Sequence, residues 1–354
     1  MQTTTHPDAA SEVKFSAEVS RGFTQWLKSK NISLVLSTYK VGKVIFLGVD
    51  PQNELWIYNR NVGRCLGLKA DATGFWVSSD SWLYRFENTM PAQRKGTKGE
   101  DALYSPRQGY FTGDMDIHDI AVTPDNEPLF VNTMCNCLAK PSWKSSFEMV
   151  WKPPFITDLI AEDRCHLNGL AMKDGKPAYM TAVSTSNTFD GWRDQRESGG
   201  VLLEVKSGKV LCSGLSMPHS PRWYKGKLWL HNSGHGEFGY INFSKKKFEP
   251  VAFCPGYLRG LDFVDDYAVV GLSLPRENSS FTGLPLDTAL TERKIQAKCG
   301  LYIVELKSGR ILHSVKFGGV VSELYDVAVL PGVRQPAALS PFSETLKNTL
   351  FIPG

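Results

Sequence analysis

The sequence predicts an all-β protein that forms a single β-propeller of six blades, and two observations lead to this prediction. The first is the scarcity of helical periodicity. After a leader around residues 16–30, in which Phe23, Trp26 and Leu27 have helical spacing, the chain consists of short apolar runs separated by turn residues. The second is a short element, a small or polar residue followed by an apolar strand, that recurs six times. It occurs at Gly67-Leu68, Asp119-Ile120-Ala121-Val122, Gly169-Leu170-Ala171-Met172, Arg222-Trp223-Tyr224, Gly260-Leu261-Asp262-Phe263 and Asp326-Val327-Ala328-Val329.

The spacing of these elements matches the size of a propeller blade. Successive starts are 52, 50, 53, 38 and 66 residues apart, and a blade of four antiparallel strands with its loops takes about 40 to 50 residues. When the incomplete N-terminal unit is counted as the first, the fifth unit shows four strands most clearly. They lie at 221–224, 227–232, 238–243 and 248–253, with a turn at Lys225-Gly226. We expect six blades, with seven as the alternative.

The two ends of the repeat region complement each other. Runs at 34–39, 44–49 and 55–59 match the second, third and fourth strands of a blade, whereas 326–329 is a first strand without the others. Joining them in one sheet would close the ring and leave no edge between the first and last blades. The expected organisation is a polar leader with a short helix (1–31), one propeller domain (32–338) and a C-terminal tail (339–354).

Composition excludes several classes of protein. The 354 residues are 42% hydrophobic and 21% charged, with 40 basic and 36 acidic residues, which argues against a disordered or fibrous protein and gives no nucleic-acid-binding signal. No apolar run approaches the ~20 residues of a membrane span, and residues 1–12 lack the apolar core of a signal peptide. Seven cysteines in such a chain suggest reduced thiols. We therefore expect a cytoplasmic protein with no nucleic-acid or membrane partner.

Aligning the six units brings polar residues into two rows. Three positions before the element lie Arg64, Asp116, His166, His219, Tyr257 and Glu323; one position before it lie Leu66, His118, Asn168, Pro221, Arg259 and Tyr325. Residues two apart on an extended strand share a face. Both rows are therefore expected to point into the central channel at one end.

The histidines in these rows suggest a metal site. His118, His166, His219 and Glu323 would converge from four blades, and imidazole with carboxylate is a ligand set for a divalent transition metal, with Fe, Zn or Mn as candidates. A single such histidine would more often bond to backbone or channel water, but three in consecutive blades favour a metal. Glu323 has an equally good alternative, pairing with Arg259 or Arg64.

Two functional hypotheses follow. The first is a metal-dependent enzyme, lactonase-like or oxygenase-like, that acts on a small molecule or a peptide side chain. Its expected catalytic residues are Glu323 and Asp116, and Asn168, Arg222, Arg259 and Tyr325 would bind substrate, with the two arginines holding an anionic group. The second is a non-catalytic scaffold for a protein partner, in which Trp192 and Phe281 of the long loops would be anchors.

Several long segments carry a resemblance to a known family. They are Asp116-Ile117-His118-Asp119, 164–171, 217–223, 255–261 and 323–327. With these segments the chain, from Ile32 to Val333, resembles an uncharacterised bacterial family of conserved hypothetical proteins with a propeller-like domain, a resemblance that implies no activity.

A looser likeness is to six-bladed propellers of the gluconolactonase and strictosidine-synthase type, in which an Asn-Gly-Leu-Ala stretch resembles 168–171. It implies a divalent ion at the channel mouth. Those enzymes bind metal mainly through Glu, Asn and Asp, whereas this chain offers histidines, as in the carotenoid-cleavage oxygenases; that comparison is one of chemistry only.

Overall fold

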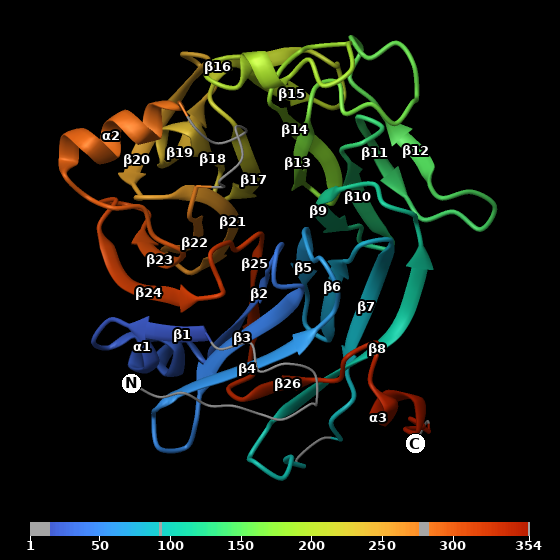
Figure 1. Cartoon of the computed structure of the whole chain (residues 1–354), viewed down its shortest axis with the longest axis vertical. Helices are drawn as coiled ribbons and strands as arrows, with labels where there is room; N and C mark the ends of the chain where they lie inside the picture. The colour runs from blue at the N-terminus through green and yellow to red at the C-terminus, as the bar shows by residue number, and fades with distance from the viewer. Residues whose placement is uncertain (1–14, 92–93, 276–282, 353–354) are drawn as a thin grey trace.

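The computed structural model of the chain describes residues 15–91, 94–275 and 283–352 and shows six β-sheets arranged around a central axis (Figure 1). Each sheet is one blade, and its innermost strand faces the axis. The predicted six-bladed propeller is confirmed, and the seven-bladed alternative is wrong.

Blades 3, 4 and 5 each consist of four consecutive strands that pair antiparallel from the axis outward. Blade 3 comprises β9 (Ile117–Val122), β10 (Pro128–Asn132), β11 (Cys137–Lys140) and β12 (Glu148–Trp151); blade 4 comprises β13 (Leu167–Lys173), β14 (Lys176–Ala182), β15 (Gly200–Glu204) and β16 (Val210–Leu215); blade 5 comprises β17 (Pro218–Tyr224), β18 (Lys227–Asn232), β19 (Glu237–Asn242) and β20 (Lys247–Phe253). The four strands predicted for the fifth unit are therefore correct to within a few residues.

Blade 1 closes the ring, as predicted. Its inner strand β25 (Val327–Pro331) comes from the end of the repeat region, and its other strands are β2 (Ile32–Ser37), β3 (Lys43–Val49) and β4 (Leu55–Asn61). Val327 pairs with Leu36 and Pro331 with Ile32. The ring is thus held shut by strand pairing between segments about three hundred residues apart in the chain.

Blades 2 and 6 each gain a fifth strand at the outer edge. Blade 2 comprises β5 (Leu68–Ala70), β6 (Gly74–Ser78), β7 (Trp82–Asn88), β8 (Ala102–Phe111) and β26 (Pro336–Ala338); blade 6 comprises β21 (Tyr257–Val264), β22 (Tyr267–Ser273), β23 (Gly300–Glu305), β24 (Ile311–Gly319) and β1 (Phe15–Val19). β26 is parallel to β8, and β1 is antiparallel to β24. Two segments near the ends of the chain therefore cover two sheet edges, and this arrangement was not predicted from the sequence.

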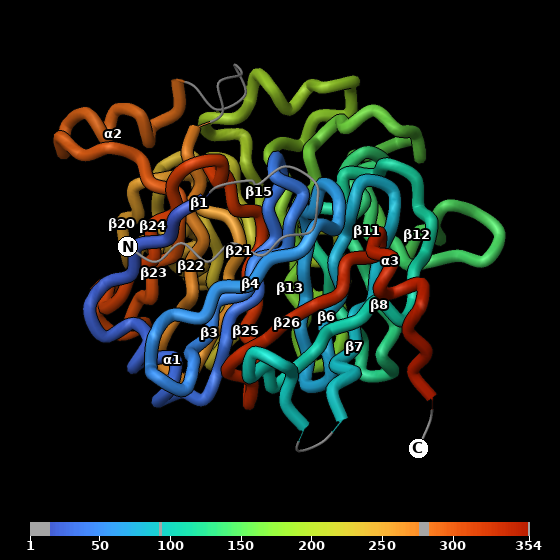
Figure 2. The backbone as a smooth tube through the Cα atoms, turned by 60° about the horizontal axis from the view of Figure 1, so that its bottom comes forward, coloured from blue at the N-terminus to red at the C-terminus, as the bar shows by residue number. Residues whose placement is uncertain are grey.

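Among the described residues, three α-helices lie outside the blades: α1 (Phe23–Lys30), α2 (Pro285–Arg293) and α3 (Glu344–Lys347). The predicted leader helix is α1, whose Phe23, Trp26 and Leu27 pack against blades 1 and 6. α2 and the connection between β14 and β15 project from one side of the ring (Figure 2), where Leu284 and Leu286 pack with Trp192. None of the helices in the described part of the chain is long and apolar enough to cross a membrane.

Local chemistry explains both the turns and the core. At the predicted turn Lys225-Gly226, both residues have positive φ (46° and 75°), as in the type I′ turn that joins two strands of matching twist. The core lies between the facing surfaces of neighbouring blades. The ring of Phe46 in blade 1, for example, stacks 6.0 Å from Tyr104 and lies 5.9 Å from Phe75 in blade 2.

Three aspartates link inner strands of neighbouring blades near the axis. A carboxylate oxygen of Asp119 accepts from the backbone N–H of Leu170 (2.9 Å), and Asp326 does the same with Leu68 (3.0 Å). Asp262 accepts from the N–H of Val329 (2.9 Å). Each aspartate also accepts from the backbone N–H of the next residue. These bonds tie blade 3 to blade 4, blade 1 to blade 2, and blade 6 to blade 1.

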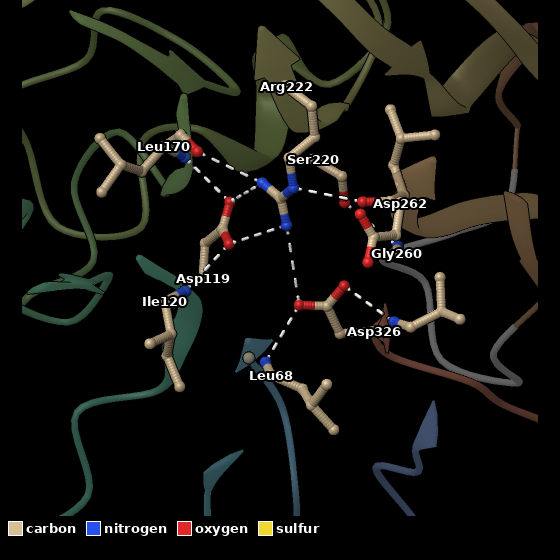
Figure 3. Close-up of polar contacts among 12 residues, drawn as sticks. Leu68, Asp119, Ile120, Leu170, Ser220, Arg222, Gly260, Asp262 and Asp326 are labelled. Carbon is tan, nitrogen blue, oxygen red and sulfur yellow. Dashed lines mark hydrogen bonds and ion pairs between the residues drawn. The ribbon is translucent and has the colours of Figure 1, made fainter. Parts of the chain in front are cut away.

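Arg222 of β17 connects these links (Figure 3). Its guanidinium donates two bonds to Asp119, 2.7 and 3.0 Å long, and lies 3.8 Å from the carboxylate of Asp326. It also donates to the backbone oxygens of Leu170 and Leu261. Burial alone would lower the pKa of Arg222, but the two carboxylates outweigh burial and raise it. One cation, whose side chain is 14% exposed, thus joins the inner strands of several blades.

Candidate metal centre

Three histidines come together where consecutive inner strands begin. His118 is the second residue of β9, His166 immediately precedes β13, and His219 is the second residue of β17. One ring nitrogen from each lies within 4.8 Å of those of the other two, and all three residues are buried. We call these three residues the histidine cluster. It could hold a metal ion.

The hydrogen bonds of the rings fix which nitrogen faces the cluster. Nδ1 of His118 lies 2.7 Å from the backbone oxygen of Asp116, and Nδ1 of His219 lies 2.9 Å from that of Met217. Nδ1 of His166 lies 2.9 Å from a carboxylate oxygen of Asp163. Because these oxygens only accept, each Nδ1 carries a proton, and the neutral form of each ring has its lone pair on Nε2. Histidines that bind metals are held by the same kind of bond.

Burial favours the neutral form that binds metal. Loss of water lowers the pKa of His118 to about 3, against a smaller opposing effect of Asp116. Burial, followed by the nearby charge of Arg259, holds the pKa of His219 well below its usual value. At neutral pH these two rings therefore present lone pairs rather than protons. Nε2 of His219 is buried and has no hydrogen-bond partner among the described residues, so this donor set fits a transition metal.

Two groups around the cluster were not predicted as part of it. Asp163 accepts from His166 and also, through the same oxygen, from the indole N–H of Trp192 (2.9 Å). Burial would raise the pKa of Asp163, but these contacts outweigh it, and the pKa lies below its usual value. The hydroxyl of Thr133 donates to the backbone oxygen of Leu167, so its oxygen is available to accept from Nδ1 of His118 (2.9 Å).

One of the two predicted protein-docking anchors does not fit the structure. Trp192 is only 3% exposed, and its ring stacks 4.2 Å from His166. The prediction that Trp192 is a surface anchor is therefore wrong, because its indole N–H and its apolar face are both used inside the protein. Phe281 lies outside the described residues.

Neither of the predicted carboxylates belongs to the group of mutually close ligand atoms. Asp116 has a carboxylate oxygen 3.6 Å from Nδ1 of His118, on the side of the ring away from Nε2. Glu323 is buried, 3% exposed, in the segment between β24 and β25. The set of mutually close ligand atoms contains the three histidines and does not include Glu323.

The four predicted substrate-binding residues differ in their surroundings, and Arg222 differs most from the others. Tyr325 lies with its ring 5.4 Å from that of His118, and the guanidinium of Arg259 lies 4.8 Å from the Tyr325 ring. Asn168 is buried, accepts from the hydroxyl of Thr181 (2.8 Å), and its amide nitrogen has no partner among the described residues. Arg222, in contrast, is occupied by Asp119, Asp326 and backbone oxygens, as described above.

Local irregularities of the backbone explain how histidines from different rows meet. The pairing register shifts after Phe130 in β10, opposite the part of β9 that holds His118, and again between His219 and Arg222 in β17. His166 has φ 51°, an uncommon left-handed conformation for a residue with a side chain. A strict alternation of side chains does not predict these shifts.

A fourth buried histidine has a structural role and allows a test of pH dependence. His231 is fully buried, its Nε2 donates to the backbone oxygen of Gly260 (3.0 Å), and burial lowers its pKa to about 3. The unfolded chain therefore binds a proton at this histidine below about pH 6.5, whereas the folded chain does not. The free energy of unfolding should fall as the pH drops from 6.5 towards 3, by about 1.4 kcal/mol per pH unit for each such histidine.

Urea unfolding of the metal-free protein between pH 7 and 4 measures this slope. In His231→Gln, whose amide can still donate to Gly260, the free energy of unfolding should change with pH less steeply than in wild type, by about 1.4 kcal/mol per pH unit. The control is His235→Gln, which changes a partly exposed histidine of the neighbouring turn. Equal slopes for wild type and His231→Gln would contradict the prediction.

Comparisons with known proteins agree with this fold. A profile of the family described as a domain of unknown function (DUF4915) matches residues 21–339. No curated protein sequence matches the chain significantly. Among solved structures, a chain of a nidogen/laminin complex superposes with a TM-score of 0.51 at 10% identity, covering 85% of this chain and 98% of that chain. This likeness shows the fold alone.

Two further structures superpose less well. A catalytically inactive variant of virginiamycin B lyase from Staphylococcus aureus, solved with quinupristin, has a TM-score of 0.38 at 12% identity and covers 73% of this chain and 96% of its own. A protein of unknown function from Bacteroides caccae has a TM-score of 0.39 at 10% identity and covers 84% and 98%.

Proposed function

We propose that this chain, which belongs to the DUF4915 family of domains of unknown function, is a metal-dependent enzyme whose histidine cluster holds one divalent transition metal ion. The observation that carries the proposal is the common orientation of His118, His166 and His219, each of which donates from Nδ1 to a fixed oxygen. Three such imidazoles, buried and close together, form a donor set that could hold a metal ion.

The chemistry of the donor set suits Fe, Zn or Mn. Three imidazoles leave coordination positions open, and an ion held in this way polarises a bound substrate or activates water or dioxygen. The substrate would be a small molecule or a peptide side chain, and both hydrolytic and oxygen-dependent reactions are compatible with the site. We further propose a cytoplasmic location, supported by the cysteine usage of the sequence.

We also propose roles in the reaction for other residues of the predicted site. Glu323, buried near the start of β25, is the proposed base or an additional ligand, and Asp116 would assist through His118. Arg259 would hold an anionic group of the substrate, while Tyr325 and the amide of Asn168 would orient it. Arg222 has no role in substrate binding in this proposal because its guanidinium is committed to two carboxylates.

Elemental analysis tests the proposal. Wild-type protein, purified without chelator and without a histidine tag, should contain about one equivalent of a transition metal. His166→Ala and His219→Ala should contain almost none, because two imidazoles hold such an ion far more weakly than three. The matched control is His235→Ala, which removes a histidine outside the cluster and should leave the metal content unchanged.

The result that would contradict the proposal is a wild-type protein without metal. Absence of metal in wild-type protein, even after reconstitution with Fe(II), Zn(II) and Mn(II), would overturn the metal-dependent enzyme. The non-catalytic scaffold would then be the leading hypothesis, and the histidines would be polar residues of the channel wall.

A further inference from the structure

One ligand of the histidine cluster is held differently from the other two. Backbone oxygens hold His118 and His219, whereas the carboxylate of Asp163 holds His166 at 2.9 Å. Asp163 belongs to the connection between β12 and β13. The oxygen that contacts His166 also accepts from Trp192, and the other carboxylate oxygen is buried with no hydrogen-bond partner among the described residues. Asp163 is therefore a carboxylate hydrogen-bonded directly to a ring of the cluster.

The backbone around Asp163 is arranged to make this contact. Asp163 and His166 both adopt positive φ, 44° and 51°, and the turn between them returns the carboxylate to the ring three residues later. The turn is fixed at two points, since the N–H of Asp163 donates to Met134 (2.9 Å) and the N–H of Cys165 donates to the side chain of Asn136 (2.9 Å). Uncommon backbone conformations of this kind persist where surrounding contacts hold them.

Trp192 connects the site to a long loop. It lies in the connection between β14 and β15, stacks on His166 with an interplanar angle of 28°, and donates its indole N–H to Asp163. Behind it, Met217, Tyr257 and Leu284 form an apolar cluster. One side chain thus contacts both the proposed ligand and the carboxylate that holds it.

We infer that Asp163 is a positioning residue that orients His166 and supplies the negative charge that a buried ion on three neutral imidazoles requires, and that Trp192 holds this carboxylate in place. The inference rests on the proposed function. A divalent ion on three neutral rings carries two positive charges into a buried site, where an uncompensated charge is costly. A carboxylate bonded to a ligand also strengthens the ligand as a donor.

The test measures metal affinity in three variants. Asp163→Asn keeps the shape of the side chain and can still accept from His166, but it lacks the charge; Trp192→Phe keeps an aromatic ring on His166 but lacks the N–H. Zn(II) affinity, measured by competition with a chelator, should fall about 10- to 100-fold in Asp163→Asn and by a smaller factor in Trp192→Phe. Asp190→Asn, which alters an exposed ion pair with Arg193 in the same loop, should bind as wild type does.

A spectroscopic measurement separates positioning from general stability. The visible absorption of bound Co(II) should shift in Asp163→Asn, because the donor strength of His166 changes, whereas thermal unfolding of the metal-free protein reports any loss of stability. Wild-type affinity and an unshifted Co(II) spectrum in Asp163→Asn would overturn the inference while leaving the metal site intact. Wild-type protein that binds neither Zn(II) nor Co(II), and neither Fe(II) nor Mn(II), would overturn both the inference and the proposed function.

Discussion

Arg222→Ala is expected to lower the free energy of unfolding by about 3–5 kcal/mol, the cost of removing one partner from a buried ion pair. The guanidinium makes two bonds to Asp119 and lies 3.8 Å from Asp326. Those carboxylates are 2% and 3% exposed, so they would be left without their cation and without water. Urea or thermal unfolding followed by circular dichroism at neutral pH measures the loss.

Two variants show whether charge is responsible. Arg222→Met combined with Asp119→Asn removes both charges of the closest pair and should recover part of the stability lost in Arg222→Met alone. Lys225→Ala removes a nearby cation whose partner, Asp266, is exposed, and it should have little effect. If Arg222→Ala were as stable as wild type, Arg222 would not connect the blades in the way we describe, and its predicted role in substrate binding would regain support.

The inner strands could be predicted because they repeat. Each begins with a small or polar residue and an apolar run, and the closure of the ring followed from two incomplete blades whose missing parts matched. In contrast, β1 and β26 occur once each and lie on the outside of blades 6 and 2. Their pairing depends on which sheet edges the folded ring leaves open, and nothing in a short segment of five or three residues indicates that.

The candidate site was predicted in part for the same reason. His118, His166 and His219 stand out because they recur near equivalent positions of consecutive units. Asp163 does not recur, and its contact with His166 arises from a turn with positive φ that periodicity does not encode. Arg222 was predicted, with Arg259, to hold an anionic group of the substrate. Its partners, Asp119 and Asp326, come from blades 3 and 1 and are far apart in the sequence. They lie close to Arg222 once the ring has closed.

Metal ions are expected to stabilise the folded protein, and the gain should depend on the metal concentration. An ion that binds the folded chain and not the unfolded chain adds about 2.7 kcal/mol when its free concentration is 100 times the dissociation constant, and about 4.1 kcal/mol at 1,000 times. The thermal unfolding temperature of chelator-treated protein should therefore rise steadily as Zn(II) is added. His118→Ala, His166→Ala and His219→Ala should each lose most of this rise.

The histidines outside the cluster serve as the control. His235→Ala retains the three converging rings and should respond to Zn(II) as wild type does, whereas nonspecific binding to surface histidines would weaken the response in that variant as well. A rise of equal size in wild type and in all three cluster variants would place the bound ion elsewhere on the protein. Loss of the rise in the cluster variants alone would tie metal affinity to the place where the inner strands of blades 3, 4 and 5 begin, because the three buried histidines meet there.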